Sequence, residues 1–249
     1  MVTGRESIPG VRLRRRKGTG PLAAGALALA LTAVATAAAA HNIGGTDAAF
    51  VAATRGPDPI PFMYLGAKHM VTGYDHLAFL VGVIFFLFRL RQIALFVSLF
   101  SLGHSITLLA GVFFRVQVEP HLVDAVIGLS VVYKAFENLG GFRTLFGVQP
   151  DARIAVFGFG LIHGFGLATK LQALNLNPDG LLANLVSFNV GVEIGQVLAL
   201  SVILLVMTIW RRTRAFEPTA QAANVLLMLA GFVLAGHQIA GFIFGGAVS

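Results

Sequence analysis

The side chains with the clearest capacity for chemistry form a histidine and aspartate set at the start of a long apolar run. Five residues separate His69 from the adjacent pair Asp75 and His76. Ionisable side chains inside lipid are costly unless they meet a partner, an ion or water, so such residues indicate function. Imidazole and carboxylate groups ligate divalent transition metals and also act as acids and bases. The spacing therefore predicts a functional site within a membrane.

Three further ionisable residues, His104, His163 and Glu193, interrupt later apolar runs. At a rise of about 1.5 Å per helical residue, each is expected between the midplane and the outer leaflet. Glycines flank His163 and Glu193 and would let the helix backbones approach closely. Ligands from separate helices at one depth can share an ion. The expected metal site comprises His69, Asp75, His76, His104, His163 and Glu193.

The composition identifies the class of protein that must position these residues. Of 249 residues, 56% are hydrophobic and 12% are charged, against roughly 25% charged in a soluble domain. The net charge of +7 is concentrated in residues 5–17, so no nucleic-acid surface is implied. The chain has no cysteine, which excludes thiolate metal sites and cysteine nucleophiles. We expect an integral membrane protein in contact with a lipid bilayer.

Six apolar runs follow residue 68, each near the length that crosses roughly 30 Å of hydrocarbon. Backbone groups must satisfy one another in lipid, so the runs are expected to be helices. The sequence predicts an all-α fold with a six-helix transmembrane domain over residues 69–249. The expected spans are residues 69–88, 92–114, 121–139, 154–174, 181–210 and 222–244.

The first 40 residues are basic and then rich in alanine and leucine, ending in small residues, which predicts a cleaved signal peptide. The alternative is an uncleaved helix. Cleavage after Ala40 would leave His41 with a free amine that could join its imidazole on a metal. Residues 41–68 are rich in glycine and proline and are expected to form an extracytoplasmic loop, ordered or containing a short helix.

Arginines set the expected orientation. They lie between the first and second, third and fourth, and fifth and sixth spans. The positive-inside rule then places these loops in the cytoplasm and both mature termini outside. We expect a multi-pass protein of the bacterial cytoplasmic (inner) membrane.

Several other polar residues are interpreted as structural. Glu137 and Lys134 are one turn apart and are expected to form a local ion pair. His237 is expected to be a core residue and His121 an interfacial one. Interhelical hydrogen bonding is expected for Ser98, Ser101, Ser105, Asn189 and Gln196.

The segments that carry the candidate site resemble the second branch of the HupE/UreJ membrane-protein family. The matching segments are H-x5-D-H at 69–76, SLGHSIT at 101–107, FGLIHGFG at 159–166 and FNVGVEIGQ at 188–196. The resemblance implies a permease-like protein that supplies nickel or cobalt to metalloenzymes. The chain departs from the F-H-G-x-[AV]-H-G-x-E pattern of nickel permeases in this family, because only His163 and the glycines match and the acidic residue would come from Glu193.

The favoured interpretation is capture of a divalent cation, with nickel, cobalt or zinc as the ion, from the outer face. Binding should depend on pH because histidines bind metal only when neutral. One alternative is a zinc-dependent intramembrane hydrolase that uses Glu193 or Asp75 as a base. A weaker one is haem ligation by histidine pairs. The sequence does not identify a protein partner.

Overall fold

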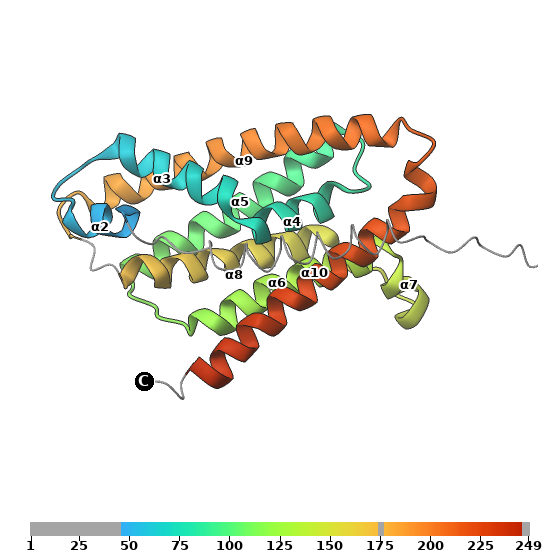
Figure 1. The fold of residues 1–249 in the computed structure, drawn as a ribbon. Coiled ribbons are helices and arrows are strands. Elements are labelled where there is room, and N and C mark those ends of the chain that lie inside the picture. Colours follow the sequence, from blue (N-terminus) through green and yellow to red (C-terminus); the bar gives the residue numbers. More distant parts are fainter. Residues whose placement is uncertain (1–45, 174–176, 246–249) are drawn as a thin grey trace, which may run out of the picture.

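A computed structural model describes residues 46–173 and 177–245. The predicted signal peptide and His41 lie outside these residues. The described chain is helical and contains no strand (Figure 1). Its helices are α2 Thr46–Ala53, α3 Pro59–Thr72, α4 Tyr74–Ile84, α5 Leu90–Phe113, α6 Pro120–Asn138, α7 Gly141–Phe146, α8 Ala152–Gln172, α9 Leu181–Arg211 and α10 Phe216–Gly245.

The bundle is built from three closely packed helix pairs, α3 with α9, α5 with α8 and α6 with α10 (Figure 1). Helices α3 and α9 run parallel, because Gly191 lies against Met63 and Gly195 against Ala67. A Cβ added at Gly195 would stand 2.6 Å from the Ala67 carbonyl oxygen. Small residues at such crossings let backbones meet without intervening side chains.

The other two pairs also have glycines where the helices cross. Helices α5 and α8 are parallel, and a Cβ at Gly103 would stand 2.6 Å from the Phe157 oxygen. Helices α6 and α10 are antiparallel, and a Cβ at Gly128 would stand 2.7 Å from the Ala235 nitrogen. Helix α4 packs against α6 and joins the pairs at the centre of the bundle.

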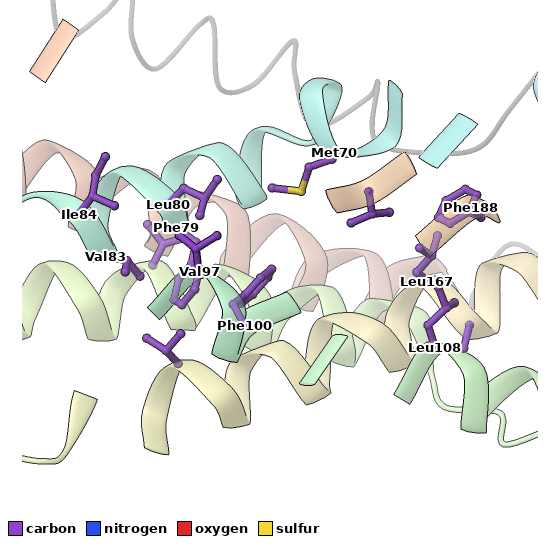
Figure 2. Close-up of a cluster of buried hydrophobic side chains, with 14 of the residues drawn as sticks. Met70, Phe79, Leu80, Val83, Ile84, Val97, Phe100, Leu108, Leu167 and Phe188 are labelled. Atoms are coloured by element: carbon purple, nitrogen blue, oxygen red, sulfur yellow. The ribbon is translucent and has the colours of Figure 1, made fainter. Parts of the chain in front are cut away.

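The apolar core lies where α3 and α4 meet α5, α8 and α9. Figure 2 shows that these buried side chains spread along the bundle, from Phe79 and Phe100 past Met70 to Phe188, on four of these helices. Each of the four is at most 2% exposed. The core therefore includes residues of the same helices that carry the candidate histidines.

Apolar side chains also cover much of the outside, and α9 alone exposes ten large ones between Leu182 and Ile209. Within the described residues, α5, α8, α9 and α10 are long and apolar enough to cross a membrane. Helix α6 carries Asp124, Lys134 and Glu137, and α4 is only 11 residues long. The last five predicted runs coincide with α5, α6, α8, α9 and α10, whereas the count of six spans stays a prediction.

The first predicted span, 69–88, is not one continuous helix. Gly73 separates α3 from α4, with φ −75° and ψ 97°, and its N–H donates to the His69 carbonyl. The extended ψ angle redirects the chain before α4 begins. Most of α3 falls within residues 41–68, where the sequence predicted an ordered loop or short helix, and α3 packs along α9.

Candidate metal site

His76 lies at the centre of a cluster of imidazoles. Its ring centre is 5.1 Å from that of His69, 5.0 Å from His163 and 6.2 Å from His104. His69 lies near the end of α3 and His76 near the start of α4, whereas His104 and His163 lie within α5 and α8. His76, His104 and His163 are at most 3% exposed. The structure thus brings together four of the six predicted ligands around one buried point.

Asp75, the fifth predicted ligand, fixes the orientation of His76. Its Oδ1 accepts hydrogen bonds from the His76 backbone N–H at 2.7 Å and from Nδ1 at 2.8 Å. A carboxylate only accepts, so Nδ1 carries the proton and the lone pair of the neutral ring lies on Nε2. Such carboxylate partners orient metal-binding histidines and raise their basicity. Asp75 is 8% exposed.

The His163 ring is oriented in the same way. Its Nδ1 donates to the Phe159 carbonyl one turn earlier on α8, at 2.7 Å. The lone pair of the neutral ring is therefore again on Nε2. Two histidines of the cluster thus hold the tautomer that binds metal through Nε2.

His104 has a different environment. It is 1% exposed, and both ring nitrogens are buried without a hydrogen-bond partner among the described residues. A buried polar group without a partner is destabilising and points to an unseen ligand, such as water or an ion. This imidazole is the clearest sign that the cluster binds something.

Aromatic side chains that sequence reasoning missed line the cluster. The Phe100 ring is 4.9 Å from His163 and 6.3 Å from both His76 and His104. The Phe79 ring is 5.7 Å from His163. Phe100 lies one helical turn before His104, and Phe79 lies three residues after His76; these spacings are the sequence signal that could have found them. The aromatic rings keep the polar cluster in an apolar setting.

Helical spacing alone does not describe the surroundings of His69 and Glu193. His69 and His76 are seven residues apart but do not share a helical stripe, because α3 ends between them; the break at Gly73 brings their rings together instead. Glu193 is three residues before Gln196 on α9, but Gln196 is fully buried whereas Glu193 is exposed. Gly191 and Gly195 turn against α3, which leaves Glu193 on the outer flank of α9. The structure does not bring Glu193 to the cluster.

The spacing of the rings suits a shared ion, although their present orientation does not hold one. Two imidazoles bound to one ion at about 2.1 Å have ring centres roughly 5 Å apart, close to the separations around His76. Within the described chain, however, no three His, Cys, Asp or Glu side chains are placed so that they could hold a metal ion. Binding would therefore require rotations of the rings.

Two expected polar interactions, one of them between helices, are present in the structure. Ser101 Oγ donates to Gln196 Oε1 at 2.7 Å, which links α5 to α9. Lys134 Nζ lies 2.7 Å from Glu137 Oε2. His237, by contrast, is exposed on α10 and is not the core residue that the sequence predicted.

Long apolar helices around a buried histidine and aspartate cluster define a polytopic helical membrane protein. The family model described as HupE / UreJ protein matches residues 45–245. The chain belongs to the HupE/UreJ family, as its motifs predicted. No curated protein and no solved structure shows significant similarity to it.

Proposed function

We propose that this protein moves a divalent transition-metal ion across a membrane, with nickel or cobalt preferred to zinc as the transported ion. The observation that carries the proposal is the group of imidazoles around His76, with the unsatisfied ring of His104 beside it. Imidazole with carboxylate suits these ions, and soft copper(I) would favour sulfur. The family resemblance to nickel and cobalt permeases supports the same class of cargo.

The ligand set favours reversible binding. Asp75 supplies one negative charge and the neutral histidines supply none, so a divalent ion would keep a net positive charge in the site. Passage requires binding strong enough to replace water and weak enough to allow release. Protonated histidines do not bind metal, so transport should slow at acidic pH.

The proposed orientation in the membrane is supported by the arginine-rich end of the bundle. Arg89, Arg143 and Arg212 lie in or beside the connections at that end (Figure 1). By the positive-inside rule this end would face the cytoplasm, and the ion would be captured from the outer face of a bacterial cytoplasmic membrane. His69, at the end of α3, would be the first ligand on this route.

The hydrolase alternative gains no support from the geometry. A zinc hydrolase needs a carboxylate base beside an open metal position. Of the two proposed bases, Glu193 is exposed on α9 and Asp75 is hydrogen-bonded to His76. A polar set without an available base fits binding better than hydrolysis.

The test combines metal binding with flux. Protein purified in detergent would be titrated with Ni²⁺, Co²⁺ and Zn²⁺ by calorimetry, and ion uptake would be followed in proteoliposomes at several pH values. His76→Ala and His104→Ala should abolish both signals. His237→Ala is the matched control, because this histidine is exposed on α10. Tightly held zinc without flux, or full uptake in both cluster variants, would refute the proposal.

A further inference from the structure

A second buried polar cluster lies at the opposite end of α4 from His76. Lys134 and Glu137 on α6 form an ion pair at 2.7 Å, and each side chain is only 10% exposed. Gln149 Nε2 donates to the other Glu137 oxygen at 3.2 Å. A buried ion pair contributes little to stability on average, because desolvation offsets the Coulomb attraction. Its presence inside an apolar bundle therefore calls for a function.

Amide side chains extend this cluster across three helices. Asn138 Nδ2 donates to the Gly82 carbonyl of α4 at 2.8 Å and to Asn224 Oδ1 of α10 at 2.9 Å. Asn224 is fully buried. Carboxylate and amide oxygens are hard ligands, which hold nickel or cobalt less tightly than imidazole does.

Helix α4 connects this cluster to the histidines. Gly82 lies six residues beyond His76, a rise of roughly 9 Å along the helix. The absence of a side chain at Gly82 makes room for Lys134, whose Cγ would be 3.1 Å from an added Cβ. The Lys134 stem therefore packs against α4 at Gly82. Helices α4 and α6 end on the same side of the bundle (Figure 1).

A chain of aromatic contacts, here called the aromatic layer, runs from the histidines to the residue beside Lys134. The ring of Phe159 is 5.8 Å from Phe79 and 5.3 Å from Tyr133. Phe79 is in contact with the His163 ring, and Tyr133 precedes Lys134 in the chain. An ion leaving the histidines toward this end of the bundle would pass the aromatic layer and next meet the ion pair.

We propose that Glu137 is a second cation site, the exit ligand for the transported ion, and that Lys134 occupies its carboxylate between transport events. A divalent ion repels the ammonium and competes with it for the same oxygen, so arrival of the ion breaks the pair and departure restores it. The inference rests on the proposed function.

The test separates binding from passage. Glu137→Gln keeps the size of the side chain and can keep the contact to Gln149. We expect Ni²⁺ or Co²⁺ binding at the histidines within twofold of the wild-type value and uptake into proteoliposomes at least tenfold slower. Glu217→Gln, an exposed carboxylate on α10, is the control and should transport at the wild-type rate.

Lys134→Met removes the competing ammonium but keeps the stem against Gly82. Calorimetry with Ni²⁺ should then reveal an additional weaker binding event that Glu137→Gln abolishes. The double variant Lys134→Met with Glu137→Gln distinguishes the proposal from a structural role. A merely structural pair tolerates joint neutral replacement, so recovered uptake in the double variant would overturn the inference.

Two further results are decisive. Wild-type uptake in Glu137→Gln would overturn the exit site and leave the proposed function standing. A wild-type protein that binds metal at the histidines but moves none would overturn both proposals.

Discussion

Replacing Gly103 by alanine should separate α5 from α8 and disrupt the cluster without altering any ligand. A Cβ at this position would be 2.6 Å from the Phe157 oxygen and 2.9 Å from the Leu161 nitrogen. Both neighbours are backbone atoms, so the helices must move apart by about 1 Å to restore van der Waals contact. His104 follows Gly103 on α5, and His163 lies on α8 two residues beyond Leu161.

The expected loss can be sized. Overpacking of this kind costs about 1–3 kcal/mol of stability. Metal–ligand distances tolerate only about 0.2 Å, so a displacement of about 1 Å between His104 and His163 should weaken binding at least tenfold, or about 1.4 kcal/mol. Calorimetric titration with Ni²⁺ measures this loss, and circular dichroism checks that the helices remain.

The matched control is Gly158→Ala on α8. A Cβ at Gly158 meets nothing within 4 Å. Gly158→Ala raises helix propensity by about as much as Gly103→Ala does, because both replace a helical glycine by alanine. This variant should bind Ni²⁺ as the wild type does. If Gly103→Ala also bound Ni²⁺ with wild-type affinity while remaining folded, the claim that close packing of α5 and α8 sets the site would be refuted.

Three other substitutions test individual contacts. Asp75→Asn should weaken Ni²⁺ binding about tenfold or more, because loss of the carboxylate that orients a metal-binding histidine typically costs this much, and leave the melting temperature nearly unchanged; a wild-type affinity in calorimetry would contradict its orienting role. Gly73→Ala favours a continuous helix by about 1 kcal/mol, so uptake into proteoliposomes should fall, and undiminished uptake would argue against the break. Ser101→Ala leaves the buried Gln196 oxygen without its donor and should destabilise the fold by about 1–3 kcal/mol with Ni²⁺ affinity retained, as thermal unfolding and calorimetry would show.

The helices were predictable where a long apolar run determines them. Helices α5, α8, α9 and α10 coincide with such runs, because lipid allows few alternatives to a continuous helix. The break at Gly73 was not predictable from hydropathy, since glycine within a helix costs only about 1 kcal/mol. Packing of α3 on α9 and of α4 on α6 decides that the helix breaks there.

The depth of the candidate residues in the membrane was predictable from the sequence, but the rotation of each helix about its axis was not. Counting residues along the helices placed His104 and His163 at the level of His76, and the structure brings all three together. The direction of Glu193 depends on how α9 turns to press Gly191 against α3. That rotation is a property of the assembled bundle, so residue spacing on one helix could not supply it.

Because the helix is interrupted at Gly73, His69 and His76 are carried by helices that pack on different partners. Helix α3 packs on α9 and carries His69, whereas α4 packs on α6 and carries His76. A sliding or rocking movement of the α3–α9 pair relative to α6 and α10 would therefore change the separation of these two rings directly. In such a movement the single extended residue between them would be the hinge, and rigid-body motion of one helix pair would open or close the cluster.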